Sequence, residues 1–595
     1  MSTAQVRPAT GVDITSVREK YLAERDKRLR PDGASQYVRL ADEFDIGDPF
    51  TPVTEREPLA EHTTVVCIGG GFSGLVVGAR LKEAGVEDVR IIDKAGDFGG
   101  TWYWNRYPGA QCDTTSYIYL PLLEETGHMP TEKYAHGPEI LEHCQRIGQQ
   151  YDLYDQALFH TEVTDLRWDA DESRWVVSTN RGDRLTAQFV TMGIGPLHVP
   201  KLPAIPGIGE FAGHSFHTNR WDYGYTGESL EKLADKRVAI IGTGATSVQA
   251  VPRLSEACGE LFVIQRTPSS VDARGNRPTD PEWFAEMATP GWQRRLLANF
   301  ADVLGGVATQ DLIQDGWTEL SWQLRNEMAT LPAGERTMAT RMTLAERADY
   351  EKMDQIRSRV DTIVADHDTA QHLKAWYRRL CKRPCFHDEY LQSFNSPNTH
   401  LVDTDGKGVE RITAKGVVAG GQEYEVDCVI YASGFEVNTG FTRRSGYEVT
   451  GRDGVTLTDR WADGMRTLHG MHTRGFPNAF VVQPSQGANL IANVPSNIVD
   501  SAATIAAIVG HAVRDGLREV EVTAEAEQAW VDLVQTAQPS AIGGPDCTPG
   551  YYNNEGQDQG SAGLRLVGYP DGPAAFFRYI EQWRAAGAFE GLEFQ

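Results

Sequence analysis

Two glycine-rich turns in the chain are placed to bind phosphate groups. The first, residues 69–74, lies between the apolar run 64–68 and a helical pattern that ends near Gly85. In this context glycines allow a tight turn, let the backbone approach a pyrophosphate and permit close helix–strand packing. An acid after the next apolar run, 89–92, can bind ribose hydroxyls. The candidate residues of this first nucleotide site are Gly69, Gly71, Phe72, Ser73, Gly74 and Asp93.

The second turn differs from the first in the residue that meets the ribose. It follows the apolar run 237–241, and a serine stands in the third glycine position. The next apolar run ends in a cation and a hydroxyl instead of an acid, which favours a 2′-phosphate and therefore NADPH over NADH. The alternative is that this arginine is solvated surface. The candidate residues are Gly242, Thr243, Gly244, Ala245, Thr246, Ser247, Arg266 and Thr267.

Two nucleotide sites, one ending in an acid and one in an arginine, suit a flavin that is reduced by a nicotinamide. The elements that position them predict an α/β protein with two Rossmann-like domains, one for FAD and one for NADP. We expect an N-terminal extension at 1–60, with a charged helix over 17–30 that forms a surface arm. The FAD domain should occupy 61–200 and 391–540, and the NADP domain 201–390, with a mostly helical insertion at about 275–380 and a C-terminal segment with an active-site loop at 541–595.

Three further expectations concern the domain crossing, two later strands and membrane spans. The Pro- and Gly-rich residues 193–209 cannot continue a helix or a central strand, so they are expected to cross between domains as a hinge. Strand-like runs at 400–404 and 426–434 look like a return to the first domain. No apolar window is expected to be long enough for a bilayer span.

Composition narrows the partners. The chain has 595 residues and a formal net charge of −25, which opposes binding to nucleic acid or to an anionic membrane. Eight scattered cysteines without metal-type spacing predict free thiols in a cytoplasmic protein and no metal site. Cys381 and Cys385 are the closest pair, and we favour packing over a redox role.

Two longer motifs carry a specific resemblance. Residues 99–113 read GGTWYWNRYPGAQCD, and a second pattern consists of Phe211, Gly213, His217, Trp221 and Asp222. Both resemble the fingerprints of type I Baeyer–Villiger monooxygenases. The N-terminal extension is similar to that of a subgroup acting on large-ring, steroid or polycyclic ketones, including pentalenolactone-pathway enzymes, which would mean a role in antibiotic biosynthesis.

The resemblance implies a mechanism and roles. NADPH reduces FAD, O₂ adds to give a C4a-peroxyflavin, and this attacks a ketone to form an ester or lactone. It implies that Arg383 lies beside the peroxide and that Asp113 orients this guanidinium. It also implies that His217 has a conformational or hydrogen-bonding role instead of proton transfer. Further cofactor residues implied are Gly100, Thr101, Trp102, Tyr103, Asp113, Tyr119 and Val163 for FAD, and Gln111, Cys112, Lys382 and Tyr551 for NADP.

Tyr551 is the candidate to replace a loop tryptophan that many family members carry over the nicotinamide. The rival functions are a flavin monooxygenase that oxidises amines or sulfides and a non-enzymatic nucleotide-sensing flavoprotein; Arg383 and the complete fingerprint argue against both. The sequence predicts a small ketone and O₂ as partners and a monomer or homodimer, and it does not identify the ketone or the migrating carbon.

Overall fold

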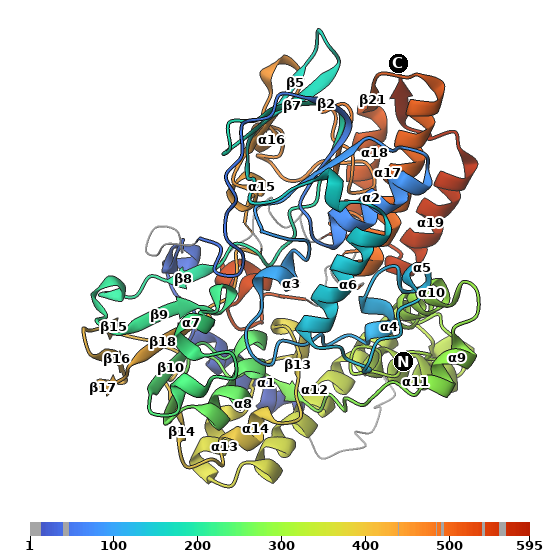
Figure 1. The fold of residues 1–595 in the computed structure, drawn as a ribbon. Coiled ribbons are helices and arrows are strands. Elements are labelled where there is room, and N and C mark those ends of the chain that lie inside the picture. The colour runs from blue at the N-terminus through green and yellow to red at the C-terminus, as the bar shows by residue number, and fades with distance from the viewer. Residues whose placement is uncertain are drawn as a thin grey trace.

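The computed structural model describes residues 13–39, 47–437, 439–482, 485–489, 493–537, 542–557 and 567–595. Two sheets dominate it, the first in the upper part of Figure 1 and the second at its lower left. Helices pack on the parallel strands of both sheets (Figure 1), whose two faces must be buried, while part of the first sheet is antiparallel. The predicted α/β class with two dinucleotide-binding units is confirmed.

The first sheet is built around β2 (His62–Ile68), which pairs in parallel with β3 (Val89–Ile92) and β7 (Arg184–Met192). Helix α2 (Phe72–Glu83) connects β2 to β3, so the predicted β–α–β unit is present. α2 packs against α17 (Val494–Asp515). The other strands of this sheet are β4 (Ala157–Leu158), β5 (Val163–Asp169), β6 (Arg174–Thr179), β19 (Glu448–Thr450) and β20 (Ala479–Val481).

The second sheet consists of parallel strands in the order β14-β11-β10-β18-β9. Helix α8 (Ala245–Ala257) follows β10 and precedes β11, which gives the second β–α–β unit. The strands are β9 (His214–His217), β10 (Arg237–Ile241), β11 (Glu260–Gln265), β14 (Thr399–Asp403) and β18 (Cys428–Tyr431). Our assignment of the runs at 400–404 and 426–434 to the first domain is therefore wrong. Any buried parallel strand carries the same apolar run, and the pattern does not say which sheet it joins.

Helices fill the part of the chain between β12 (Val271–Asp272) and β13 (Cys385–Phe386). The Asp302 carboxylate on one of them accepts a hydrogen bond at 2.9 Å from Arg578 on α19 (Pro573–Ala586), so these helices also touch the first unit. They are α9 (Pro281–Met287), α10 (Trp292–Gly305), α11 (Glu319–Thr330), α12 (Met338–Ile363) and α13 (His367–Leu373).

The smaller elements complete the chain. The helices among them are α3 (Thr101–Trp104), α4 (Ser116–Tyr119), α5 (Leu123–Thr126), α6 (Gly137–Gln150), α7 (Tyr223–Thr226), α14 (Tyr390–Ser393), α15 (Phe441–Ser445), α16 (Leu457–Arg460) and α18 (Ala524–Gln535). The remaining strands are β15 (Arg411–Ile412), β16 (Gly416–Ala419), β17 (Gln422–Glu425), β21 (Val520–Val522) and β22 (Leu592–Phe594).

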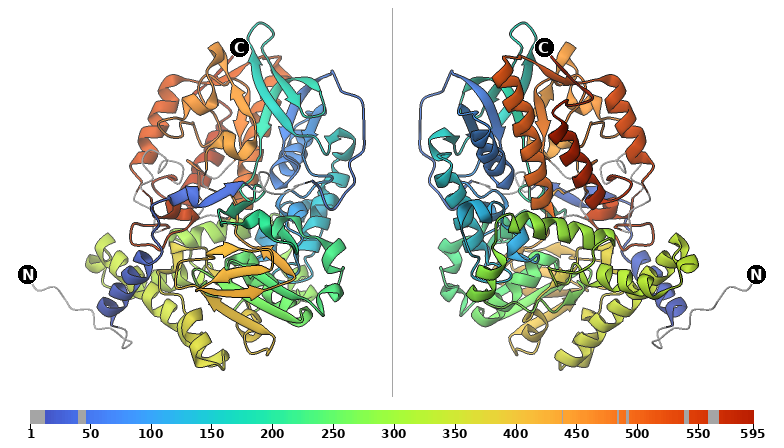
Figure 2. Two further views of the ribbon diagram at one scale, coloured as in Figure 1. Left: turned by 90° about the vertical axis from the view of Figure 1, so that its left-hand side faces the viewer. Right: turned by 90° about the vertical axis from the view of Figure 1, so that its right-hand side faces the viewer.

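The N-terminal extension is not the surface arm that we expected. Helix α1 (Ile14–Asp26) lies against the second unit (Figure 2), and Tyr21 is buried there, its ring stacked 5.3 Å from that of Tyr350. Beyond the helix, β1 (Tyr37–Arg39) pairs antiparallel with β8 (Lys201–Pro203). The helix begins earlier than residue 17 because Asp13 caps its N-terminus, and it ends at Asp26 instead of residue 30.

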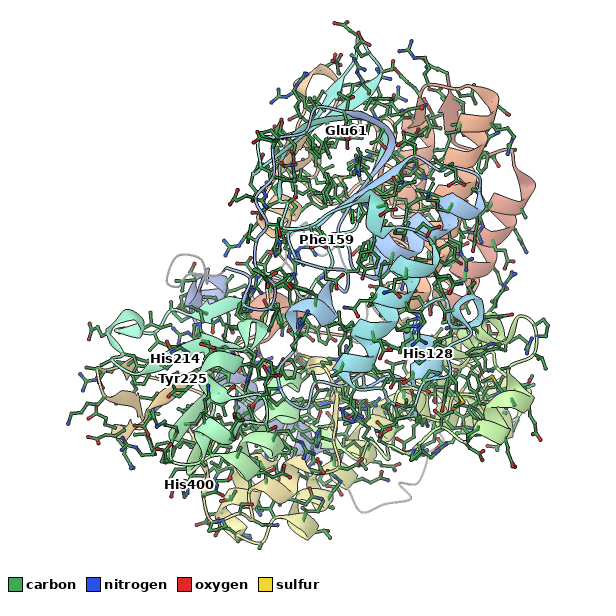
Figure 3. The ribbon with its side chains drawn as sticks, in the orientation of Figure 1. Glu61, His128, Phe159, His214, Tyr225 and His400 are labelled. Carbon is green, nitrogen blue, oxygen red and sulfur yellow. A yellow bond between two sulfur atoms is a disulfide. The ribbon has the colours of Figure 1, made fainter. Side chains whose placement is uncertain are left out.

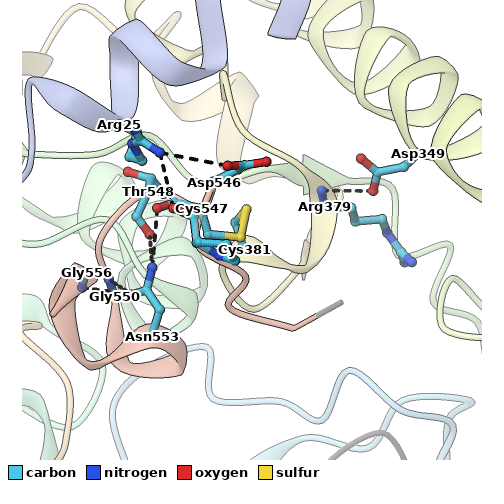
Figure 4. Close-up of a disulfide and its surroundings, with 11 residues drawn as sticks. Arg25, Asp349, Arg379, Cys381, Asp546, Cys547, Thr548, Gly550, Asn553 and Gly556 are labelled. Atoms are coloured by element: carbon cyan, nitrogen blue, oxygen red, sulfur yellow. Dashed lines mark hydrogen bonds and ion pairs between the residues drawn. A yellow bond between two sulfur atoms is a disulfide. The ribbon is translucent and has the colours of Figure 1, made fainter. Parts of the chain in front are cut away.

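The cysteines also differ from expectation. Cys381 forms a disulfide with Cys547, which ties the C-terminal segment to the second unit (Figure 4). The other six cysteines are free and buried, Cys385 among them. The partners are 166 residues apart, so sequence spacing gave no sign of the bond.

Helix α17 corrects the expectation about apolar windows. It is long and apolar enough to cross a membrane by length and composition, yet 67% of that window is buried in the protein. A core helix passes the same test, and packing against α2 is the role that the structure gives it. Within the described parts of the chain, His, Cys, Asp and Glu form no group able to hold a metal ion.

Candidate active site and cofactor sites

A cavity of about 970 Å³ lies between the two units, and both glycine turns open onto it. The turns follow β2 and β10, at the carboxyl ends of parallel strands, where ligands bind in open α/β sheets. Arg383, Asp113 and Tyr551 line the same cavity. The structure therefore brings both nucleotide turns and the candidate catalytic pair together.

The first turn is shaped for a bound phosphate. Gly69 has a φ of +106°, and a Cβ on Gly74 would lie 1.9 Å from the Gly69 carbonyl oxygen. Side chains are therefore excluded at both positions, and no side chain caps α2 at Gly71, which leaves its first N–H groups to a ligand. Asp93 at the end of β3 is buried and accepts a hydrogen bond from Ala95 N at 2.7 Å. Burial raises the pKa of Asp93 although backbone N–H groups donate to its carboxylate.

Aromatic residues form part of the wall beyond this turn. Trp102 Nε1 donates to the hydroxyl of Tyr119 at 3.2 Å, and both side chains line the cavity. Tyr103 is absent from the lining, because its hydroxyl donates to Thr51 at 2.7 Å on the other side. Of the other predicted FAD residues, Gly69, Gly71, Phe72, Ser73, Asp93, Gly100, Thr101 and Val163 line the cavity, and Gly74 lies behind it in the packing of α2 on β2.

The second turn has more open space. Gly242 has a φ of +114°, and a Cβ on Gly244 would meet nothing within 4 Å. Thr243 donates to the carbonyl of Thr267 at 2.7 Å and so ties the turn to the end of β11. Thr243, Ala245, Thr246 and Thr267 line the cavity, whereas Ser247 is buried in α8 and does not.

The Arg266 side chain lines the cavity close to other cationic side chains. Its Nη2 lies 3.4 Å from the hydroxyl of Tyr37, its Nη1 donates to Gln36, and its carbonyl accepts from Arg28 Nε at 3.2 Å. All three partners belong to the N-terminal extension. This anchoring argues against a solvated surface arginine. Lys382 lies nearby, and burial together with Arg266 lowers its pKa to about 8.

Arg383 and Asp113 form a fork-to-fork pair at the cavity. Arg383 Nε and Nη2 donate to the two carboxylate oxygens at 3.1 and 2.7 Å. The guanidinium also lies 5.0 Å from the centre of the Trp317 ring, and Trp317 Nε1 donates to the Asp113 carbonyl at 2.8 Å. Burial alone would lower the pKa of Arg383, but Asp113 outweighs it and the pKa lies well above its ordinary value. The arrangement fixes a permanent positive charge.

Three further predicted NADP residues lie around this pair. Gln111 donates to the carbonyl of Tyr134 at 2.7 Å and accepts from Arg274. Burial raises the pKa of Cys112 to about 12, so its thiol stays neutral. Burial and Tyr552 raise the pKa of Tyr551 well above its ordinary value, and the two rings lie 4.4 Å apart. Gln111, Cys112, Tyr551, Lys382 and Arg266 all line the cavity.

The linker fingerprint lies outside the cavity lining and has structural contacts. Asp222 accepts from Tyr225 N at 3.0 Å and lies 2.9 Å from His214 Nε2, and the His214 ring stacks 4.1 Å from that of Tyr225 (Figure 3). Buried Trp221 donates to Thr226 at 3.1 Å. Phe211 packs beneath the second sheet, and a Cβ on Gly213 would lie 2.7 Å from the Asp427 carbonyl oxygen.

His217 is the fingerprint residue most easily taken for a base. Its Nδ1 accepts a hydrogen bond from Asn219 N at 3.1 Å. Burial lowers the pKa of His217 to about 3, so the ring is neutral at physiological pH. A buried neutral ring that accepts a backbone hydrogen bond is suited to the hydrogen-bonding role that the resemblance implies, which stays a prediction.

Comparison with known proteins gives the family. The family described as pyridine nucleotide-disulphide oxidoreductase matches residues 66–281. Neopentalenolactone D synthase of Streptomyces avermitilis is 50% identical over 98% of this chain and 99% of its own, and a Baeyer–Villiger monooxygenase of Stachybotrys chlorohalonatus is 48% identical over 98% and 94%. The chain belongs to the Baeyer–Villiger monooxygenase family. The solved polycyclic ketone monooxygenase of Thermothelomyces thermophila agrees, with a TM-score of 0.90 and 38% identity over 98% of this chain and 99% of that one.

As a Baeyer–Villiger monooxygenase, the protein is an oxidoreductase that uses FAD and NADPH. The residues of the two turns fit such groups, since the open space at Gly244 and the uncapped end of α2 leave room and donors for phosphates. Several lining residues were missed from the sequence: Arg30, Gln36, Tyr37, Lys201, Trp317 and Glu555. They come from distant segments, and no local pattern identifies them.

Proposed function

We propose that this enzyme converts a bulky cyclic or polycyclic ketone, of terpenoid, steroid or macrocyclic type, into an ester or lactone with NADPH and O₂. The support for the substrate class is similarity to proteins named neopentalenolactone D synthase and polycyclic ketone monooxygenase. A role in antibiotic biosynthesis is consistent with the first of these names.

The observation that carries the proposed mechanism is the Arg383–Asp113 pair at the cavity. When bound, FAD reduced by NADPH supplies the activation of molecular oxygen. Arg383 would supply a fixed positive charge beside the site where negative charge develops on the reacting oxygen. The Asp113 carboxylate accepts hydrogen bonds from two nitrogens of the Arg383 guanidinium and so fixes the plane of that group. A flavin enzyme that oxidises soft amines or sulfides has no need of this cation, and a nucleotide sensor has none either.

The proposed cofactor sites follow from the two turns. FAD would bind at Gly69, Gly71 and the N-terminal end of α2, and Asp93 would accept a hydrogen bond from its ribose. NADPH would bind at Gly242 and Gly244, with its 2′-phosphate at Arg266 and Lys382. The support for this choice is that Arg266 is anchored by the N-terminal extension and faces the cavity.

We also infer a cytoplasmic enzyme that acts as a monomer or homodimer, with no nucleic-acid or membrane partner. The net charge of −25 supports the exclusion of anionic polymers and surfaces. The burial of α17 in the first unit supports its role as a core helix.

Replacement of Arg383 tests the mechanism. Arg383→Ala should keep bound FAD and still oxidise NADPH, but the yield of ester should fall by about a hundredfold or more, as when one preorganised donor is lost. Arg383→Lys, which keeps the charge but loses the fork, should retain an intermediate yield. An unchanged yield from Arg383→Ala would remove this residue from the mechanism.

A panel of ketones tests the substrate class. Cyclopentanones, macrocyclic ketones, steroids and terpenoid ketones would each be incubated with enzyme, NADPH and O₂, and the products identified by mass. The proposal expects an increase of 16 mass units from a polycyclic or macrocyclic ketone, which is one oxygen atom. Turnover of the small ketones alone would contradict it.

A further inference from the structure

Lys201, Arg266 and Lys382 line one part of the cavity, and Glu555 reaches between them. Lys201 Nζ lies 3.4 Å from Glu555 Oε1, and Arg266 Nη2 lies 3.5 Å from Glu555 Oε2. Three cations in one wall repel one another unless an anion lies among them. In this structure, that anion is a carboxylate from the C-terminal segment.

The Glu555 carboxylate is deeply buried but makes few hydrogen bonds. Glu555 is 4% exposed, and its Oε2 accepts no hydrogen bond from any described residue. Burial would raise the pKa of Glu555, yet Lys201, Arg266 and Lys382 outweigh it and hold this pKa below its usual value, so the group is ionised. A buried charged oxygen without a hydrogen bond is unusual in a folded protein. The wall is therefore better suited to an anion with more acceptor oxygens.

The backbone that delivers Glu555 is also unusual. Asn554 and Glu555 have φ values of +50° and +57°, which side-chain-bearing residues rarely adopt. The segment is anchored at one end by the disulfide of Cys547 and braced by Asn553, whose Nδ2 donates to the carbonyl of Thr548 at 3.2 Å (Figure 4). The segment from Cys547 to Glu555 thus holds the Glu555 carboxylate beside the three cations.

We propose that Glu555 is an internal substitute for the 2′-phosphate of NADPH, displaced from Lys201, Arg266 and Lys382 when that phosphate binds. This inference rests on the proposed NADPH site at the second turn. A phosphate dianion brings three oxygens and a larger charge to the same cations, so it competes with the single carboxylate. NADH carries no 2′-phosphate and does not displace Glu555. The proposal also makes Lys201 a third ligand of the phosphate.

The test compares nucleotide binding to the FAD-loaded enzyme, measured by calorimetry with NADP⁺, NAD⁺ and 2′,5′-ADP. In Glu555→Gln the competing charge is gone, so NADP⁺ and 2′,5′-ADP should bind about tenfold more tightly, while NAD⁺ affinity should stay the same. Lys201→Ala should weaken NADP⁺ and leave NAD⁺ unaffected. An equal change for NADP⁺ and NAD⁺ in Glu555→Gln, or none, would overturn the proposal and leave Glu555 a structural anchor.

Asp546→Asn provides the matched control, because it removes the same charge from the same segment. Its carboxylate is 65% exposed and lies 3.9 Å from Arg25, away from the cations. It should not change the binding of either nucleotide. Arg266→Ala separates this proposal from the one on which it rests. If Arg266→Ala loses no preference for NADP⁺ over NAD⁺, the 2′-phosphate site itself is wrong; if that preference is lost but Glu555→Gln gains nothing, the displacement alone is wrong.

A second measurement uses the unaltered enzyme, in case the variants fold poorly. Hydrogen exchange of the peptide covering residues 550–557 should change when 2′,5′-ADP is added, because Glu555 leaves its partners. Adenosine 5′-monophosphate, which lacks the 2′-phosphate, should leave that exchange unchanged. Equal exchange with and without 2′,5′-ADP would contradict displacement.

Discussion

Titration of Lys382 should make nucleotide binding depend on pH, and the direction of this dependence follows from the pKa of Lys382. Burial and the neighbouring Arg266 lower its pKa to about 8, so the amine loses its proton as the pH rises through 8. Because a 2′-phosphate attracts the protonated amine, NADP⁺ affinity should fall by about tenfold from pH 7 to pH 9. NAD⁺ affinity should stay flat over the same range. Calorimetric titrations at pH 7, 8 and 9 measure both.

Lys382→Arg is the control for this dependence. A guanidinium keeps its charge throughout this pH range, so the variant should bind NADP⁺ with little change between pH 7 and pH 9. The same slope in the variant as in the original enzyme would show that another group titrates. The family resemblance implied an NADP contact for Lys382, but the lowered pKa depends on Arg266 and on burial, which the sequence does not display.

At the scale of elements, the N-terminal extension, which contains helix α1 and strand β1, holds Arg266 through direct contacts from Arg28, Gln36 and Tyr37. Tyr21 fastens α1 by stacking on Tyr350 and by accepting a hydrogen bond from Arg357 at 2.9 Å. Tyr21→Ala removes a buried aromatic ring, which costs about 3 kcal/mol or more where the site does not collapse. The extension should then loosen, and NADP⁺ affinity should fall by about tenfold while NAD⁺ changes little. Hydrogen exchange over residues 14–39 and calorimetry check the two effects.

Tyr21→Phe is the matched variant, since it keeps the ring and loses only the hydroxyl. It should retain most of the stacking and bind NADP⁺ within about threefold of the original enzyme. If Tyr21→Ala loosens residues 14–39 without weakening NADP⁺, the extension does not position Arg266.

The two β–α–β units could be predicted from the sequence because each is local. The strand Val89–Ile92 was predicted with its observed bounds. The pairing of Thr399–Asp403 was predicted wrongly, since its partner Glu260–Gln265 lies far away in the sequence. The buried face of α1 was missed because its apolar residues are few among charged ones. Local patterns predict elements, and packing between distant segments decides where they go.

The candidate site likewise combines residues that motifs predicted with residues that only the folded chain brings together. The turn residues and the Arg383–Asp113 pair were predicted from motifs, the pair through a family resemblance. Glu555 and Lys201 had no motif, because only the folded chain brings them to Arg266. Tyr103 had a motif, but its hydroxyl is committed to Asp48 and Thr51 away from the cavity.

At the scale of the whole molecule, the Cys381–Cys547 disulfide links the C-terminal segment to the residues beside Lys382 and Arg383. A cross-link that closes a long loop stabilises a protein by about 2–4 kcal/mol. In Cys547→Ser, residues 542–557 should exchange amide hydrogens faster, and Tyr551 should cover the cavity less steadily. Water would then reach the site more often, so the ester formed per NADPH oxidised should fall by roughly twofold or more.

Cys428→Ser is the control for this last experiment, because it changes a buried free thiol in the same unit and breaks no bond. It should leave the exchange of residues 542–557 and the yield per NADPH as they are. Treating the original enzyme with a reductant should reproduce the Cys547→Ser behaviour, since both open the same link. If reduction and Cys547→Ser leave the yield per NADPH unchanged, the C-terminal segment is held at the cavity by other contacts, such as the hydrogen bond that Arg25 donates to the Pro545 carbonyl, and the disulfide only adds stability.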